Sequence, residues 1–536
     1  RLQGLSVESS VCRYGLLQKS AQHVANGQGA ACRLLMALGH LPECEASTAR
    51  QAVIGIGPTS SNYRTPLKEL IQAISKTGFA SAVTIFTGIV CTKVLALVTG
   101  PTGVGLINIL RQMVAFFLIP ATINGNNAIV QGISKRRSKM SQIQYQSVVF
   151  WLVALLTLAT AAGMVLWARP IASYFFKSPT QTEVAVIRFL AVPTVLTAGS
   201  YYVKALINGY RAIGRLALVD VSAAVSTLLL VYPVARLIAA RHNTAFILYL
   251  ALPQLVAVIF GVAFLNRMGR QRILGLKALD RALFWSETRY FVSFSATLMG
   301  TGLMLQGTVL AIQAVVANQM TIAAVGVFSA GWALSTRYLS LVTNSFGTYY
   351  LPTLTGVRDA VERDSLICNM QRVVILLLTP LLVLLIAFKP MVVRLLYTED
   401  FLPAVDIIQW MLIADYLRFS AWTVGMLLLS ERQLKVFFWK EILLQLFLLG
   451  GSICAVMVFQ RLEGIGIAYL TTMTANLLFL VWYARRRYRF TVRKDVFFYW
   501  ISGLLIVLGT SLAYWRSTTI DMRFLIGTAL TMALVY

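Results

Sequence analysis

The chain has 536 residues, of which 58% are hydrophobic and 12% are charged, and its mean hydropathy is +0.72. This composition excludes a soluble globular domain and indicates a polytopic membrane protein. The formal net charge of +27 favours anionic partners, but the Lys and Arg residues occupy short segments between apolar runs, so we expect membrane lipid and an anionic substrate and no nucleic acid.

Residues 1–66 differ from the rest of the chain because they are mixed polar and small and lack the apolar run and cleavage site of a signal peptide. We expect a poorly ordered or non-native tail that is dispensable for membrane insertion and export. A functional cytoplasmic appendage is the alternative.

From Lys68 onward, apolar runs of about 20 residues, the length that crosses a bilayer, follow one another with short connections. The predicted spans are residues 71–99, 104–131, 147–168, 185–209, 217–239, 244–266, 288–317, 321–350, 373–396, 404–430, 436–459, 463–484, 496–515 and 522–536. The chain stops inside the last of these about fourteen spans, at Tyr536, which predicts a truncated C-terminus.

The loop charges predict the orientation. Connections on the N-terminal side of the membrane carry about 23 Lys and Arg residues, against about 9 in the opposite set. Since positively charged loops stay in the cytoplasm, we expect a cytoplasmic N-terminus.

A weak internal repeat accompanies the spans. Val-Leu-Ala at 94–96 and Val-Gly-Leu at 104–106 recur as Val-Leu-Ala at 309–311 and Val-Gly-Val at 325–327, with offsets of 215 and 221 residues. The repeat, together with the first twelve spans taken as two sets of six, favours two six-helix lobes. Transporters built in this way place the substrate path at the lobe interface.

The predicted fold is therefore an all-α polytopic membrane protein with two six-helix lobes in pseudo-twofold arrangement and about two extra C-terminal transmembrane helices. The predicted boundaries are 1–66 for the tail, 67–284 for the N-lobe, 285–487 for the C-lobe and 488–536 for the additional helices.

Cations lie inside several predicted spans. A charge at bilayer depth costs at least about 2.5–3.5 kcal/mol and normally faces a bundle interior or a water-filled cavity. The candidate substrate-binding cations are Lys93, Arg111, Lys204, Arg337 and Arg418. Polar residues share helical faces with them, namely Asn108, Gln112, Asn126, Asn208 and Asn344. Because Arg and Lys suit phosphate oxygens, this pattern predicts a cavity for a phosphorylated substrate, although such amides also serve as interhelical hydrogen-bond partners.

Asp415 is the acid that lies deepest among these cations, one helical turn before Arg418. It is a candidate coupling residue, and a simple ion pair with Arg418 is the alternative. Neither a zinc site nor a disulfide framework is expected from six widely spaced cysteines. We expect no cofactor and no enzymatic activity, since His242 is the only histidine after the tail and lies in a loop.

Several motifs together resemble the polysaccharide-lipid flippases of the O-antigen and lipid III type, within the multidrug/oligosaccharidyl-lipid/polysaccharide exporter superfamily. These motifs are Lys93-Val94-Leu95-Ala96, Gly100-Pro101-Thr102-Gly103-Val104-Gly105, Arg111-Gln112, Val325-Gly326, Tyr350-Leu351-Pro352-Thr353-Leu354, Leu396-Tyr397 to Phe401, and Asp415-Tyr416-Leu417. The resemblance covers about Lys68 to Arg487.

The resemblance implies alternating access that moves undecaprenyl-diphosphate-linked oligosaccharides across the bacterial inner membrane for surface polysaccharides such as the O-antigen of lipopolysaccharide. It implies a lipid-diphosphate-linked glycan as substrate, with polysaccharide polymerase and chain-length proteins as partners. The sequence departs from the family in its first 66 residues, in the helices beyond the usual twelve, and at Ser335-Thr336-Arg337, where an acid is expected.

Two other functions are compatible with a protein that has many membrane spans. A multidrug or other amphiphile exporter of the same fold is the first alternative, since fold does not fix function, but an exporter of cationic drugs should carry deep acids where this chain carries bases. A membrane glycan polymerase or ligase is the second, but it should have one long periplasmic loop, and the connections here are short. The phosphate-binding G-x-x-x-x-G-K-[ST] motif of ATP-driven exporters is absent.

Overall fold

The computed structural model describes residues 64–136, 138–240, 244–269, 280–357 and 359–515, with the backbone alone described at 64–79, 337–349 and 352. The chain divides into two compact units, residues 1–72 and 73–536, and the structural description concerns the second. Most of the predicted tail and the predicted span 522–536 lie outside the described residues.

The first half of the described chain begins with α4, which holds the first predicted span and most of the second. A bend separates the two spans at Gly100, where a φ of 63° and the following Pro101 interrupt the helix. The helices of this half are α4 (Arg64–Thr122), α5 (Asn126–Lys135), α6 (Lys139–Leu166), α7 (Ala168–Ser173), α8 (Gln181–Phe189), α9 (Ala191–Gly209), α10 (Ile213–Ala239) and α11 (Ala245–Arg267).

The second half begins with two long helices and ends at α19. Its elements are α12 (Arg281–Gln319), α13 (Ile322–Gly356), α14 (Ala360–Ala387), α15 (Lys389–Leu396), the short 3-10 helix η2 (Glu399–Phe401), α16 (Ala404–Ser430), α17 (Leu434–Phe459), α18 (Glu463–Tyr488) and α19 (Lys494–Ala513). The predicted span 373–396 is interrupted, because α14 ends at Ala387 and a new helix, α15, begins at Lys389 with Pro390 in its first turn, where the missing N–H of proline is tolerated.

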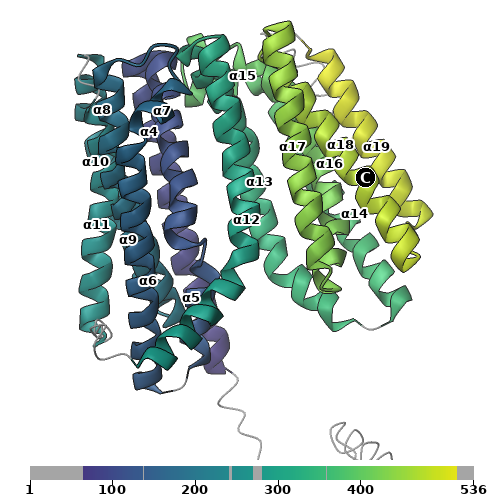
Figure 1. The fold of residues 1–536 in the computed structure, drawn as a ribbon. Coiled ribbons are helices and arrows are strands. Elements are labelled where there is room, and N and C mark those ends of the chain that lie inside the picture. Colours follow the sequence, from purple (N-terminus) through teal and green to yellow (C-terminus); the bar gives the residue numbers. More distant parts are fainter. Residues whose placement is uncertain (1–63, 137, 241–243, 270–279, 358, 516–536) are drawn as a thin grey trace, which may run out of the picture. The chain divides into compact units, whose positions relative to one another are not determined.

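Eleven helices in the described part of the chain are long and apolar enough to cross a membrane, and Ile322–Thr336 forms a shorter apolar helical stretch. All regular structure in the described ranges is helical (Figure 1). The prediction of an all-α polytopic membrane protein is therefore confirmed. Its physical basis is that a helix satisfies all of its backbone hydrogen bonds within one segment, which the bilayer core requires.

The helices of the second unit contact each other in two groups. In one group, α9 packs against α5, α6 and α11, and in the other α16 packs against α13, α14 and α18. Helix α12 contacts both, because its first turns reach α5 and α6 and its later part packs against α17 (Figure 1). The predicted lobe boundary at residue 284 stays a prediction.

Candidate functional site

Helices α4 and α13 cross at a pair of glycines. A Cβ atom at Gly105 would lie 2.1 Å from the Ile322 carbonyl oxygen, and a Cβ atom at Gly326 would lie 2.1 Å from the Pro101 carbonyl oxygen. No larger residue fits between backbones that approach so closely, so glycine at both positions permits the contact. Since these glycines hold corresponding positions in the sequence repeat, the two copies of the repeat meet here.

Lys93 contacts the end of α15. Its ammonium group donates hydrogen bonds to the carbonyl oxygens of Arg394, at 2.7 Å, and of Tyr397. The last carbonyl groups of a helix have no partner within the helix, and a cation there also complements the helix dipole. Lys93 thus joins α4 to a segment some 300 residues later in the chain. Carbonyl oxygens carry no formal charge, so these two contacts do not offset the charge of the Lys93 ammonium group.

A third contact also links the first half of the chain to the second. The Asn318 side-chain amide, near the end of α12, donates to the carbonyl oxygen of Tyr174, which follows α7. In the predicted topology this contact, the Lys93 contact and the glycine crossing all lie on the side of the membrane opposite the N-terminus. These three contacts join the two halves on that side, and Arg136, which follows α5, pairs with Glu287 of α12 on the opposite side.

Arg111 is the cation of the predicted set whose guanidinium has no hydrogen-bond or ion-pair partner within the described residues. Its side chain is exposed on the second part of α4. The neighbouring amides of the predicted polar face are engaged, because Asn108 donates to the Val104 carbonyl oxygen at 2.9 Å and Gln112 donates to Gln306 Oε1 of α12 at 2.7 Å. Arg111 is thus available to an anion.

Lys204 pairs with an acid. Its ammonium lies 2.8 Å from Asp220 Oδ1, and the two side chains are 30% and 41% exposed. Asp220 also lines a cavity of about 430 Å³ between α4 and α10, whose wall includes Ala80 and Thr84. The pair leaves no net charge at this position.

Asp415 is fully buried within α16. Its carboxylate accepts hydrogen bonds from the Ser335 hydroxyl at 2.7 Å and the Tyr469 hydroxyl at 3.1 Å. Arg418 donates to the same Tyr469 oxygen at 2.8 Å, so Tyr469 bridges the predicted acid and the predicted cation. Ser335 belongs to the tripeptide where the family resemblance leads one to expect an acid, and the acid that it contacts comes from α16.

The other predicted residues contribute less. The side chains of Arg337 and Asn344 lie outside the described residues. Asn126 donates its backbone N–H to the Tyr201 hydroxyl at 3.0 Å, and the backbone carbonyl of Asn208 accepts from the Arg211 N–H at 2.8 Å.

Two buried lysines were not among the predicted site residues. Lys440, inside the predicted span 436–459, lies within α17, lines a cavity of about 580 Å³ between α17 and α18, and pairs with Glu441 at 2.5 Å. Lys389, inside the predicted span 373–396, is fully buried at the start of α15 and donates to Gln409. A cation just inside an apolar run was the available signal for both. No group of three or more His, Cys, Asp or Glu residues able to hold a metal ion occurs in the described part of the chain.

The comparisons with known proteins found two curated relatives and several solved structures of similar fold. The chain is 22% identical over 378 residues to the lipid III flippase of Escherichia coli (strain K12). The aligned residues cover 70% of this chain and 88% of the relative, and the same values hold for the lipid III flippase of Shigella flexneri. Among solved structures, a lipid II flippase in an inward closed conformation aligns with a TM-score of 0.63 at 13% identity, covering 87% of this chain and 97% of that chain. An inward-facing multidrug resistance transporter of the MATE family aligns with a TM-score of 0.62 at 11% identity, covering 78% and 98%.

These structural matches establish the fold that the two transporter types share. The model of the polysaccharide biosynthesis protein family matches residues 94–406, more than half of the sequence. The chain therefore belongs to the polysaccharide biosynthesis protein family, as the motifs around Lys93, Arg111 and Asp415 predicted.

Proposed function

We propose that this protein flips undecaprenyl-diphosphate-linked oligosaccharides from the cytoplasmic to the periplasmic leaflet of the bacterial inner membrane, for assembly of a surface polysaccharide such as the O-antigen of lipopolysaccharide. The family membership and the lipid III flippases among its relatives support lipid-linked glycan as the cargo. The single observation that carries the proposal is Arg111, a cation within a membrane-spanning helix that has no partner among the described residues.

The physical argument concerns the diphosphate. Two negative charges cannot cross hydrocarbon without compensation, because desolvating an ionised group costs far more than ordinary binding provides. Arg111 offers a fork of N–H donors that matches phosphate oxygens, and Lys93 adds a positive charge whose contacts among the described residues are carbonyl oxygens and not carboxylates. Arg337 remains a proposed member of the set, whereas Asp220 offsets the charge of Lys204.

Alternating access is the proposed cycle. The contacts of Lys93 with α15, of Asn318 with Tyr174 and of Gly105 with Gly326 would close the periplasmic side, with the N-terminus in the cytoplasm. Release of cargo then requires these contacts to break. Polysaccharide polymerase and chain-length proteins are the proposed partners that receive the cargo.

The buried cluster of Asp415, Ser335, Tyr469 and Arg418 is the proposed coupling element. The Asp415 carboxylate is fully buried, and it accepts hydrogen bonds from two hydroxyl groups close to the Arg418 guanidinium. Its interactions therefore change strongly when it gains or loses a proton or a cation. We expect Asp415→Asn to remove the dependence of flipping on the driving ion gradient. Unchanged gradient dependence in this variant would exclude the cluster from coupling.

The test of the function compares Arg111→Gln with Arg188→Gln in cells that depend on each variant. Arg188 is an exposed arginine near a helix end in the same half of the chain, so its neutralisation removes the same charge at a place without a predicted role. We expect Arg111→Gln to insert at normal levels, to accumulate lipid-linked glycan on the cytoplasmic face and to reduce surface polysaccharide. Normal export by Arg111→Gln, or efflux of a cationic dye by the wild type, would contradict the proposal and favour an exporter of other amphiphiles.

A further inference from the structure

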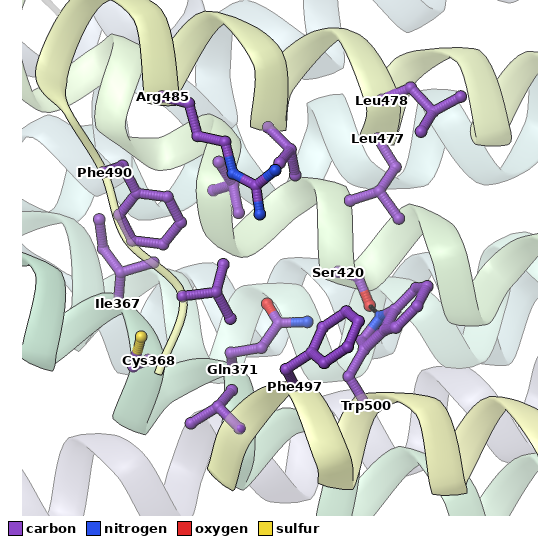
Figure 2. Close-up of a pocket in the computed structure, with 14 residues that line it drawn as sticks. Ile367, Cys368, Gln371, Ser420, Leu477, Leu478, Arg485, Phe490, Phe497 and Trp500 are labelled. Carbon is purple, nitrogen blue, oxygen red and sulfur yellow. Dashed lines mark hydrogen bonds between the residues drawn. The ribbon is translucent and has the colours of Figure 1, made fainter. Parts of the chain in front are cut away.

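A cavity of about 210 Å³ lies between α14, α16, α18 and α19, at the end of the helices where α18 turns into α19 (Figure 2). Apolar side chains such as Ile367, Val424, Leu477 and Phe497 form most of its wall. Phe490 and Val492, in the connection between α18 and α19, also line it, so the cavity reaches the level where the spans end.

Arg485 is the charged residue of this wall. It belongs to the last turn of α18, and its guanidinium extends toward the space between Gln371 and Phe490 (Figure 2). No described residue forms a hydrogen bond or an ion pair with its side chain. Other polar groups of the wall are engaged, because Gln371 accepts from the Thr423 hydroxyl and Ser420 accepts from Trp500 Nε1 at 2.9 Å.

Several arginines on the same side of the helices have partners, whereas the side chains of Arg487 and Arg489, like that of Arg485, have no hydrogen-bond or ion-pair partner among the described residues. Arg363 pairs with Asp364 at 3.1 Å, Arg493 pairs with Asp495 at 2.5 Å, and Arg372 donates to the Tyr499 hydroxyl at 3.2 Å. Arg485 has no hydrogen-bond or ion-pair partner among the described residues, and it lines an apolar cavity. The site thus combines guanidinium N–H donors for a phosphate group with a dry space for hydrocarbon.

The size and place of the cavity suit one lipid chain. An engineered apolar cavity of about 150 Å³ stays dry and binds benzene, so a cavity of about 210 Å³ accepts a somewhat longer stretch of hydrocarbon. The basic segment that contains Arg485 predicts a cytoplasmic position, and the cytoplasmic leaflet is the one that carries anionic lipids. A headgroup phosphate at Arg485 and an acyl chain below it fit this arrangement.

We propose that this cavity is a binding site for an anionic phospholipid, with one acyl chain between α14, α16, α18 and α19 and its phosphate on Arg485. The occupant is a resident membrane lipid and not the transported cargo, because none of the lining residues comes from α4, α12 or α13, where the proposed cationic path lies. The proposal therefore does not depend on the proposed flippase function.

Cys368 provides a reporter, because its thiol lines the cavity and is almost fully buried, whereas Cys454 is exposed. The experiment uses full-length protein in which all cysteines except these two are serine, purified in detergent. Alkylation of Cys368 by a small apolar thiol reagent is followed by mass spectrometry, with Cys454 as the internal control. The probes are phosphatidylglycerol, diacylglycerol with the same chains, glycerol 3-phosphate and a polyprenyl diphosphate.

We expect phosphatidylglycerol to slow alkylation of Cys368 by about tenfold, the effect of one charge-assisted hydrogen bond, and to leave Cys454 unaffected. Arg485→Gln should lose this protection, while Arg487→Gln, two residues away, exposed and not part of the wall, should retain it. Leu477→Trp should fill the cavity and slow alkylation without added lipid. If that variant fails to fold, the comparison of Arg485→Gln with Arg487→Gln decides alone.

Each other result would overturn the proposal. Equal protection by diacylglycerol would mean that the charge is irrelevant, and protection by glycerol 3-phosphate would mean that the chain is irrelevant. Stronger protection by the polyprenyl diphosphate would assign the cavity to the cargo. Protection of the wild type without any added lipid would mean that protein, such as residues 516–536, occupies it.

Discussion

Lys93, Arg111 and Lys204 are cations of predicted spans, but their charged groups have different surroundings. Lys93 binds carbonyl oxygens, Lys204 pairs with Asp220, and the Arg111 guanidinium has no described partner. Three cations of predicted spans therefore contribute differently to the field that an anionic substrate meets. The difference follows from neighbours that lie on other helices.

The pairing of Lys204 with Asp220 predicts an asymmetric response to neutralisation. Lys204→Gln alone leaves a net negative charge beside the cavity between α4 and α10, so flipping of a lipid diphosphate should fall. Lys204→Gln combined with Asp220→Asn should restore it, because the pair then again has no net charge. The measurement is surface polysaccharide at matched protein levels. A double variant as defective as the single one would show that the Lys204 ammonium itself contacts substrate.

Lys389 predicts a pH dependence of stability. It lies between the membrane-spanning helices α14 and α16, and its burial lowers the pKa of its ammonium to about 8 in the folded protein, an effect that Asp406 partly opposes. Because the unfolded chain binds the proton more tightly, this residue opposes folding fully below pH 8, and the opposition fades as the pH rises toward the usual lysine pKa of about 10.5.

The measurement compares the unfolding temperatures of the wild type and of two variants as the pH changes. Between pH 7 and pH 9, the unfolding temperature of the wild type should rise relative to that of Lys389→Met, which has no titrating group at this position. Lys435→Met, at an exposed lysine, should run parallel to the wild type. A constant difference between wild type and Lys389→Met across this range would contradict the lowered pKa.

At the scale of elements, the glycine crossing of α4 and α13 limits how closely the two halves approach. Inserting a methyl group into a tight contact costs about 1–3 kcal/mol. Gly326→Ala places its Cβ 2.1 Å from the Pro101 carbonyl oxygen, whereas Gly331→Ala on the same helix meets its nearest atom, from Ile408, at 3.5 Å. The first substitution should therefore open the crossing, and the second should be tolerated.

The measurement is the yield of a disulfide cross-link between cysteines placed at Tyr174 and Asn318. These positions are close, because the Asn318 side chain contacts the Tyr174 backbone carbonyl. We expect efficient cross-linking in the wild-type background and with Gly331→Ala, and a clear loss with Gly326→Ala. Equal yields in all three backgrounds would show that the crossing does not control closure on this side.

At the scale of the whole molecule, the orientation in the membrane is the feature that loop charges predict. Single cysteines at Lys139 and Lys277 should resist a membrane-impermeant thiol reagent in intact cells, because their loops are expected in the cytoplasm. A cysteine at Lys177, between α7 and α8, should react. Labelling at Lys139 would reverse the topology and with it the direction of the proposed transport.

Most of the predicted spans correspond to a helix of the structure because hydropathy is a local property. A run of about 20 apolar residues has to form a helix in a bilayer whatever its neighbours are, so most helix positions follow from the sequence alone. The breaks between α4 and α5 and between α14 and α15, which interrupt the predicted spans 104–131 and 373–396, do not. The family resemblance likewise rested on motifs that are contiguous in the chain.

The tertiary structure decided which of the polar residues in the spans are available to an anionic substrate and which are engaged by other protein groups. The sequence identified Arg111, Lys204 and Asp415 as candidates, since each lies within an apolar run. It gave no sign that Asp220 offsets Lys204, that Tyr469 joins Asp415 to Arg418, or that the end of α15 binds Lys93. These partners lie between 16 and 304 residues away along the chain, and only helix packing brings them within hydrogen-bond distance. Hydropathy and helical periodicity report on one segment at a time, whereas the free energy of a buried charge depends on the atoms that surround it.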